Sequence, residues 1–244
     1  MDLEPTLALL IYSTLAAATA AVGVLPHALR REPSLAEIGW ANAVAAGLML
    51  GVAYALLTAG LKEGLAAGGL GALLGVVFVR GTHALAGTAE LDLEELDGSG
   101  PEVAYRALLS DIVHGAHEGV AIGAAMVLSI PLGIAMAVTL GVHNVPEAVI
   151  LTRVLVRRGA SLPRATALAM TSNVNQPLLA VATFAILGAA PVLVPWVTGF
   201  AVGAVTYLVL VELLPEAYQQ AGHTTIAVVT ALAMAVVVLL AGIA

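Results

Sequence analysis

The chain alternates long apolar runs with short joints that carry helix breakers or charged residues. Because about 20 apolar residues cross the hydrocarbon core of a bilayer as a helix, the pattern predicts one membrane-embedded helix in each run. The predicted helices cover residues 6–26, 39–61, 65–85, 105–129, 132–155, 162–187, 190–216 and 223–243. The long joint is an acidic loop at 86–104. We therefore expect residues 1–244 to form a single transmembrane domain of eight helices.

The composition supports this all-α, integral membrane class. Hydrophobic residues make up 60% of the chain and charged residues only 10%, far from the composition of a soluble domain. The abundant Ala and Gly suit closely packed membrane helices, and the alternation typical of membrane barrel strands is missing. The chain has no cysteine, so any metal must be held by nitrogen or oxygen ligands. No basic stripe with interleaved aromatic residues is found, which argues against nucleic acid as a partner and leaves the lipid bilayer.

The basic residues predict the orientation of the chain, since Lys and Arg concentrate in cytoplasmic joints. Lys62 lies in the second joint. The other eight basic residues flank the first, third and fifth joints: Arg30, Arg31, Arg80, Arg106, Arg153, Arg157, Arg158 and Arg164. We expect these joints in the cytoplasm and both termini outside it. The acidic loop is then a cytoplasmic connector, with cation collection or regulation as alternatives. The N-terminal MDLEP lacks the basic segment of a signal peptide, so we expect the first helix to be retained.

Two motifs with one spacing lie inside the fourth and fifth predicted helices. HGAHEG occupies residues 114–119, and HNVPEA occupies residues 143–148. Each motif places a histidine four residues before a glutamate, which is one helical turn, so both side chains share a face. Ionisable side chains at membrane depth occur where they pair, line a wet path or bind a ligand. The repeated motif therefore predicts a functional site.

Folding the two helices into an antiparallel hairpin about Pro131 predicts which motif residues face one another. His114 comes level with Glu147, and Glu118 comes level with His143. Two imidazoles and two carboxylates then converge inside the bilayer, a donor set that suits zinc or another borderline divalent metal. The two carboxylates neutralise a dication, which lowers the cost of removing its water. The alternative for each residue alone is a hydrogen bond between helices.

Further polar residues are candidates for additional ligands or a metal pathway. Pro146 removes one helical hydrogen bond and frees the carbonyl of Val142 for water, a side chain or an ion. The alternative for the other candidates is polar packing between helices or, near helix ends, contact with water. The candidates are Asp111, His117, Asn144, Asn173, Gln176, Glu212 and Glu216. The histidines expected at the surface are His27, His83 and His223.

Taken together, these features resemble the ZIP family (Zrt/Irt-like proteins) of divalent metal transporters, and the chain is similar to its bacterial members. The resemblance rests on the eight spans, the long third joint, the paired motifs, the polar residue before Pro177 and the ELLPEA segment that begins at Glu212. HNVPE is the most specific match. The resemblance implies that the primary metal site consists of His114, Glu118, His143 and Glu147.

The resemblance also implies a mechanism, a location and a partner. Spans one, four, five and six would form a transport unit that moves against a scaffold of the other four spans, in an elevator-type alternating-access cycle. The protein is then expected to be a homodimer in a bacterial inner or plasma membrane.

The first motif departs from the family pattern. Gly115 stands where the family usually has asparagine, His117 where it usually has proline, and Gln176 where many members have glutamate. In members that hold two metals, the second is bridged through these positions. The resemblance therefore implies a single metal, with His117 as a candidate substitute ligand.

The expected function is transport of a divalent transition metal into the cytoplasm, without catalytic residues or an organic cofactor. Zinc is the expected substrate, and Fe²⁺, Mn²⁺, Cd²⁺ and Co²⁺ are alternatives, because nitrogen and oxygen ligands accept all of them. Two other hypotheses stay open. An intramembrane metal-dependent hydrolase would use a zinc-bound water, although the chain lacks an HExxH motif. A metal-sensing or structural membrane protein would hold its ion permanently.

Overall fold

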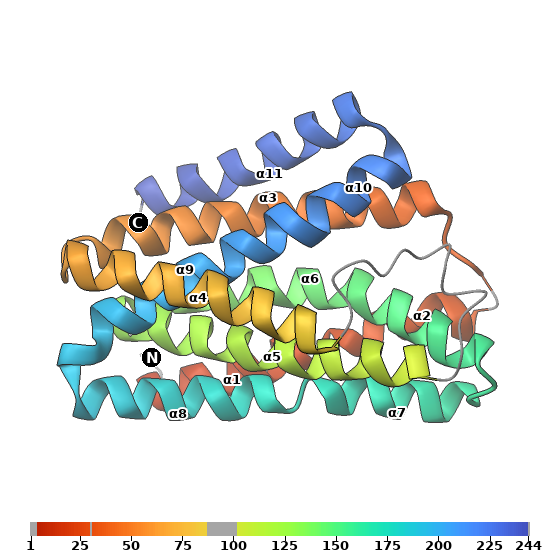
Figure 1. The fold of residues 1–244 in the computed structure, drawn as a ribbon, viewed down its shortest axis with the longest axis horizontal. Helices are drawn as coiled ribbons and strands as arrows, with labels where there is room; N and C mark the ends of the chain where they lie inside the picture. Colours follow the sequence, from red (N-terminus) through yellow and green to blue (C-terminus); the bar gives the residue numbers. More distant parts are fainter. Residues whose placement is uncertain (1–3, 30, 87–101, 244) are drawn as a thin grey trace.

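A computed structural model of the chain describes residues 4–29, 31–86 and 102–243, which are mainly helical (Figure 1). The predicted acidic loop at 86–104 lies outside the described residues apart from the adjoining helix ends, and so does Arg30. The helical segments are α1 (Pro5–Ala18), α2 (Ala20–Ala28), α3 (Leu35–Gly60), α4 (Leu65–Ala86), α5 (Glu102–Leu128), α6 (Ile130–Arg157), α7 (Leu162–Ser172), α8 (Asn175–Ala189), η2 (Pro191–Leu193), α9 (Val194–Leu208), η3 (Val209–Leu213), α10 (Leu214–Ala221) and α11 (His223–Ile243).

Some neighbouring segments follow one another as one long helical rod, so the described residues form eight spans. The pairs α1–α2 and α7–α8 are each one span, and η2, α9, η3 and α10 make another. Six of the spans are long and apolar enough to cross a membrane by themselves: Pro5–Ala28, Leu35–Gly60, Leu65–Leu85, Ile130–Arg157, Pro191–Ala221 and His223–Leu240. The remaining two are α5, which carries the first motif, and the α7–α8 pair. The predicted all-α membrane fold class is confirmed.

Local chemistry explains the interruptions within the rods. Pro177 has no N–H to donate to the carbonyl of Asn173, and α7 ends at Ser172, just before Asn173. Between α1 and α2, the hydroxyl oxygen of Thr19 lies 2.6 Å from the carbonyl oxygen of Gly141 on α6. Helix α6 itself continues through Pro146.

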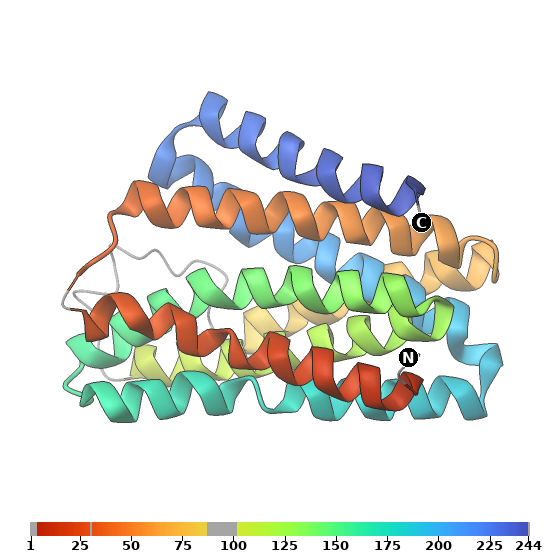
Figure 2. The same cartoon turned by 180° about the vertical axis from the view of Figure 1, so that it is seen from behind.

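The spans pack as two groups (Figures 1 and 2). The motif group consists of α1, α2 and α5 to α8, and holds both motifs. The scaffold group consists of α3, α4, α9, α10 and α11 with η2 and η3. Packing of α3 against α6 and of α5 against α9 joins the two groups. The motif group contains spans one, four, five and six, the same spans that the family resemblance assigns to a transport unit.

Glycines set the closest helix contacts within each group. A Cβ placed on Gly203 of α9 would lie 2.0 Å from the carbonyl oxygen of Ala72 on α4. A Cβ on Gly119 of α5 would lie 2.3 Å from the carbonyl oxygen of Gln176 on α8. For every described glycine with a neighbour within 4 Å, the nearest atoms belong to the same group. Backbone-to-backbone contact therefore ties each group together internally.

Apolar side chains fill the boundary between the groups instead. The main hydrophobic core includes Met49 and Leu56 of α3, Ile122 of α5, Leu140 of α6 and Leu208 of α9, all fully buried. The closest glycine contacts thus lie within each group, and fully buried apolar side chains fill the boundary between the groups.

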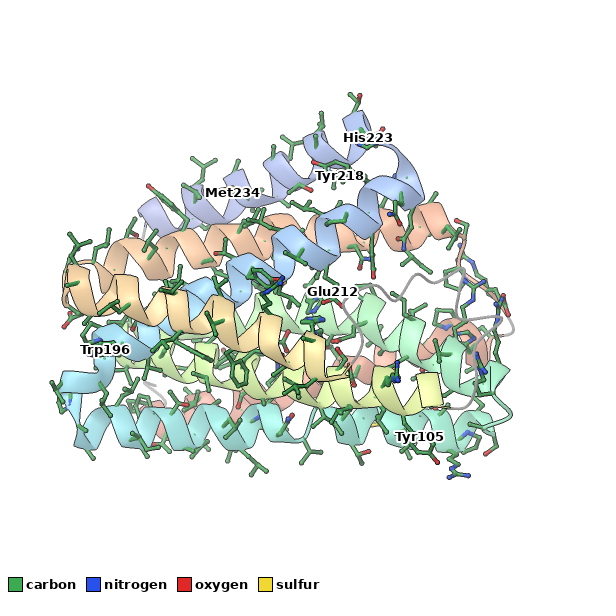
Figure 3. All side chains as sticks on the ribbon, viewed as in Figure 1. Tyr105, Trp196, Glu212, Tyr218, His223 and Met234 are labelled. Atoms are coloured by element: carbon green, nitrogen blue, oxygen red, sulfur yellow. The ribbon has the colours of Figure 1, made fainter. Side chains whose placement is uncertain are left out.

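The outside of the bundle is apolar, as contact with lipid requires. Leu73 of α4 and Leu239 of α11 are more than half exposed. Trp196 lies near one end of the bundle, whereas Tyr105 and Tyr218 lie toward the other (Figure 3). Aromatic residues are enriched at both membrane–water interfaces, so these positions fit a bundle that spans the bilayer along its long axis.

Candidate metal centre

The four motif residues converge between α5 and α6, and we call them the quartet. His114 Nδ1 lies 3.1 Å from Glu147 Oε1. His143 Nε2 lies 3.6 Å from Glu118 Oε1 and 3.9 Å from Glu147 Oε2. One non-helical residue, Ser129, separates the two helices and keeps them in antiparallel register. The pairing of levels predicted from the hairpin is confirmed by these distances.

The quartet is almost removed from solvent. The exposed fractions are 0% for the Glu118 side chain, 5% for His114, 6% for His143 and 17% for Glu147. Two carboxylates buried this close together are costly unless protons or a cation oppose their charge. The two imidazoles and two carboxylates are donors that a divalent cation accepts, although among the described residues they are not gathered within 4.8 Å of one another as a metal cluster would be.

Two side-chain amides, those of Gln176 and Asn144, border the quartet. The side-chain amide of Gln176 donates from Nε2 to Glu118 Oε2 at 2.8 Å. Asn144 Nδ2 donates to the carbonyl oxygen of Ala16 at 3.0 Å and lies 3.4 Å from Gln176 Oε1. These contacts connect α1, α5, α6 and α8. Asn144 and Gln176 thus border the quartet, and their contacts hold Glu118 in one orientation.

Asn173 ends α7 beside the quartet. Its Nδ2 donates to the carbonyl oxygen of Ala169 at 3.4 Å, while its Oδ1 is buried without a hydrogen bond. A Cβ on Gly115 would lie 3.3 Å from that oxygen. The break in the helix therefore brings an amide oxygen against the first motif.

His117 and Asp111 are also buried near the quartet. His117 Nδ1 donates to the carbonyl oxygen of Val113 at 3.0 Å, since a carbonyl can only accept. In the neutral ring Nε2 then carries the lone pair, and this atom has no hydrogen bond. The ring meets that of His114 edge-on, with the centroids 5.5 Å apart. Asp111, one turn before His114, is 4% exposed.

Buried polar atoms without a hydrogen bond gather in this region. Native interiors contain few such atoms, and each calls for water, an ion or a functional reason. They are His117 Nε2, Glu118 Oε1, His143 Nδ1 and Nε2, Asn144 Oδ1 and Asn173 Oδ1. Their concentration around the quartet is what a site that binds water or an ion would show.

The structure also brings in a histidine that the sequence did not assign to the site. His83, in the last turn of α4, places Nε2 3.3 Å from His114 Nε2 and 3.5 Å from Glu212 Oε2. Its side chain is only 11% exposed, so the prediction of a surface position is wrong for His83. The reason is that α4 packs its last turn against α5. The sequence signal was its position inside, rather than beyond, the predicted span 65–85.

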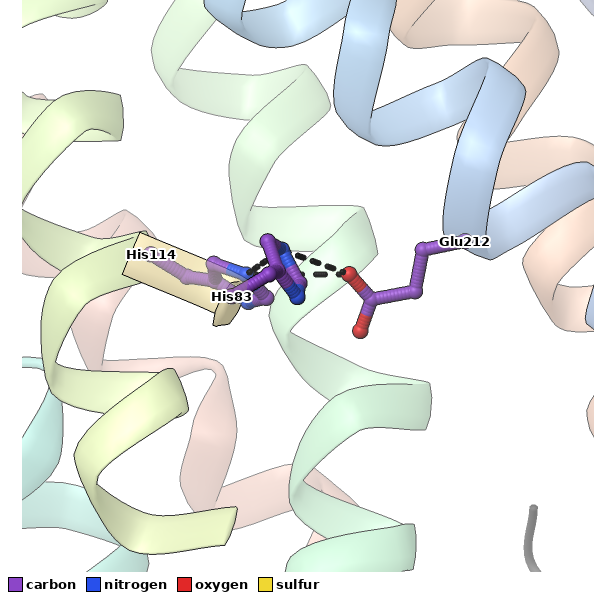
Figure 4. Close-up of side chains that lie close together, drawn as sticks. All are labelled: His83, His114 and Glu212. Carbon is purple, nitrogen blue, oxygen red and sulfur yellow. Dashed lines mark hydrogen bonds and ion pairs between the residues drawn. The ribbon is translucent and has the colours of Figure 1, made fainter. Parts of the chain in front are cut away.

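Glu212 completes a second cluster. Its Oε2 lies 3.6 Å from His114 Nε2, and Figure 4 shows the carboxylate pointing toward the two imidazole rings. Among the described residues, His83, His114 and Glu212 form the one set whose ligand atoms all lie within 4.8 Å of one another. We call this set the triad. His114 therefore belongs to both clusters, facing Glu147 with one ring nitrogen and the triad with the other.

The remaining candidates lie elsewhere. Glu216 accepts a hydrogen bond from Asn42 Nδ2 on α3 at 3.5 Å, within the scaffold group. His223 is exposed and stacks on Tyr218, as expected of a surface histidine. His27 is half-buried, with Nε2 3.3 Å from the carbonyl oxygen of Val149.

Comparison with known proteins identifies the family. The sequence model of a family described as ZIP Zinc transporter matches residues 80–244, which include both motifs and the triad. The chain belongs to the ZIP zinc transporter family. The resemblance drawn from the motifs is thereby confirmed, and this ZIP protein is a multi-pass membrane protein.

Individual relatives match different shares of this ZIP protein. The zinc transporter GufA of Myxococcus xanthus is 31% identical over 153 residues, 61% of the chain and 60% of that protein. The zinc transporter zipt-7.2 of Caenorhabditis elegans is 31% identical over 119 residues, 46% of the chain and 25% of that protein. An Arabidopsis thaliana protein is 27% identical over 224 residues, 89% of the chain and 36% of that protein. The chain thus spans less than two thirds of the length of these relatives.

Proposed function

We propose that this ZIP protein carries a divalent transition metal across the membrane, with the quartet as its transport site. The observation that carries the proposal is the convergence of His114, Glu118, His143 and Glu147 inside the helical bundle. Two relatives named as zinc transporters support zinc as the substrate. Iron, manganese, cadmium and cobalt are the alternatives, since this donor set also accepts them.

The chemistry of the quartet suits a carrier better than a permanent metal site. Two carboxylates neutralise the dication, so the loaded site bears little net charge in a low-dielectric interior. Structural zinc sites are usually closed by several thiolates, and this chain has no cysteine. We therefore expect the ion to bind reversibly and to be transported without an organic cofactor.

We also propose that the site holds one ion at a time. A second ion would need further ligands beside Glu118. Gly115 offers no side chain there, and Gln176 contributes an amide whose nitrogen already donates to Glu118. His117 Nε2 is the remaining candidate for an extra ligand.

The two helix groups support an elevator-type movement. The quartet belongs entirely to the motif group, and the glycine contacts hold that group together without crossing to the scaffold group. We propose that the motif group slides against the scaffold group and exposes the ion to each side in turn. With Arg153, Arg157 and Arg158 in the cytoplasm, both termini lie outside, and we propose that the ion is carried into the cytoplasm. A homodimer formed through the scaffold group completes this proposal.

Uptake by proteoliposomes tests the transport site. His143→Ala and Glu147→Ala should each reduce zinc uptake by at least tenfold, because each removes one ligand of the ion. His223→Ala is the matched control, since this histidine is exposed, and it should leave uptake unchanged. Full uptake by both quartet variants would refute the proposal. Bound zinc that never exchanges with free zinc would favour the structural or sensing alternative.

A further inference from the structure

The triad joins the two helix groups at one point. His83 comes from α4 and Glu212 from η3, both in the scaffold group, whereas His114 comes from α5 in the motif group. The contacts among the four quartet residues stay within the motif group. The triad is different because its ligand atoms belong to both sides of the boundary.

The distances between the three ligand atoms of the triad match those between ligand atoms around a bound metal ion. The three separations are 3.3 Å between the two histidine Nε2 atoms, 3.5 Å from His83 to Glu212 and 3.6 Å from His114 to Glu212. Bonds of about 2.0–2.1 Å at tetrahedral angles place ligand atoms roughly 3.3–3.4 Å apart. A single zinc-sized ion at the centre would therefore reach all three atoms with little rearrangement.

The backbone around Glu212 is built for this position. Glu212 lies in the π-helical turn η3, and Pro215 follows one turn later without an N–H for the carbonyl of Val211. Single π turns inside α-helices often occur at functional sites, because the extra residue redirects a side chain. Glu212 Oε2 is buried without a hydrogen bond, although the side chain as a whole is 34% exposed. Three protein ligands and partial access to solvent leave the fourth position for water, as in exchangeable zinc sites.

From this geometry we propose that His83, Glu212 and His114 form a second, transient metal site that receives the ion from the quartet. The inference rests on the proposed transport function. A neutral imidazole has one nitrogen with a free lone pair, so His114 serves either the quartet through Nδ1 or the triad through Nε2. His114 therefore cannot complete both sites at once, and we expect one ion to be bound at a time. Movement of the motif group separates His114 from His83 and Glu212, which opens the triad and releases the ion.

A thiol introduced into this cysteine-free chain detects the second site directly. In the purified full-length chain, His83→Cys should produce a thiolate-to-cobalt charge-transfer band when Co²⁺ is added. Glu212→Gln in the same background should weaken the band at least fivefold, and zinc should remove it. Thr82→Cys is the matched control, because the Thr82 hydroxyl bonds the carbonyl oxygen of Val79 in its own helix, and it should give no band. If the His83→Cys protein gives no band, the proposed metal site is refuted, and the contact between His83 and His114 is only a hydrogen bond.

Transport by a second variant tests the role of the site. His83→Gln keeps a hydrogen-bonding side chain but loses the imidazole ligand. It should lower zinc flux at least fivefold while still binding about one zinc per chain at equilibrium. Unchanged flux would overturn the transfer role even if the cobalt band is seen.

The two proposals fail in different ways. If His143→Ala and Glu147→Ala retain full uptake, the quartet is not the transport site, whatever the cobalt spectrum shows. If those variants lose uptake but His83→Gln does not, transport by the quartet stands and the second site falls.

Discussion

At the scale of single residues, Gln176 connects the quartet to its neighbours. Its Nε2 donates to Glu118 and its Oε1 accepts from Asn144. An amide here donates a hydrogen bond to a carboxylate oxygen that could otherwise bind metal. The side chain therefore orients Glu118 without adding charge to the site.

Replacing this amide should change the number of ions bound. Gln176→Glu removes the donor and adds a carboxylate about 3 Å from Glu118, a distance at which two carboxylates stay ionised only with a cation between them. We expect bound zinc to rise from one toward two ions per chain, measured by elemental analysis of purified protein. Gln176→Leu is the control and should stay at one or below. A Gln176→Glu protein that still holds one zinc would contradict this account of the missing second site.

At the scale of helices, glycine decides how closely α4 and α9 approach. The Cβ of an alanine at position 203 would overlap the carbonyl oxygen of Ala72 at 2.0 Å, so the two helices must separate. Gly81, on the same α4, has no neighbour within 4 Å of its Cβ position. The same substitution should thus have opposite effects at the two positions.

Thermal unfolding in detergent measures this difference. Gly203→Ala should destabilise the protein by about 1–3 kcal/mol, the usual cost of overpacking. Gly81→Ala should be neutral or stabilise it by up to about 1 kcal/mol, because alanine is the better helix former. Equal effects of the two changes would show that the close approach of α4 and α9 contributes little to stability.

Helix-level features divide into those that the sequence predicts and those that it does not. Apolar runs and breakers predicted the spans and the all-α class, and a hairpin count predicted that His114 meets Glu147. The π turn at Glu212 and the position of His83 could not be found this way. The position of His83 depends on how the last turn of α4 packs against α5, a contact between helices that local sequence does not encode. The π turn is a local change of backbone hydrogen bonding that the apolar pattern does not reveal. Whether the quartet binds metal stays a prediction.

At the scale of the whole molecule, the proposed orientation states which end of the bundle faces the cytoplasm. Lys62 lies in the α3–α4 joint at one end of the bundle, and Ser161 precedes α7 at the other. Both side chains are exposed, and the chain has no cysteine to interfere. Single cysteines at these positions can therefore report the orientation.

Labelling intact cells with a membrane-impermeant maleimide distinguishes the two ends. Lys62→Cys should react at once, and Ser161→Cys should react only after the membrane is permeabilised, because basic joints stay in the cytoplasm. The unsubstituted chain should not react at all. The reverse labelling pattern would contradict the proposed orientation and would place both termini in the cytoplasm.

The joint between α8 and α9 consists of Ala190 and the short η2 turn, and it ties the two helix groups together at one end of the bundle. If the motif group moves against the scaffold group as proposed, a link this short limits the displacement at this end of the bundle. Glu212 lies 22 positions along the chain from Ala190, roughly 30 Å at the rise of an α-helix. A tilt of about 10° would move that point by about 5 Å, one helical turn. In the proposed movement, the displacement would therefore grow with distance from this joint, and a tilt of this size would be enough to part His114 from Glu212.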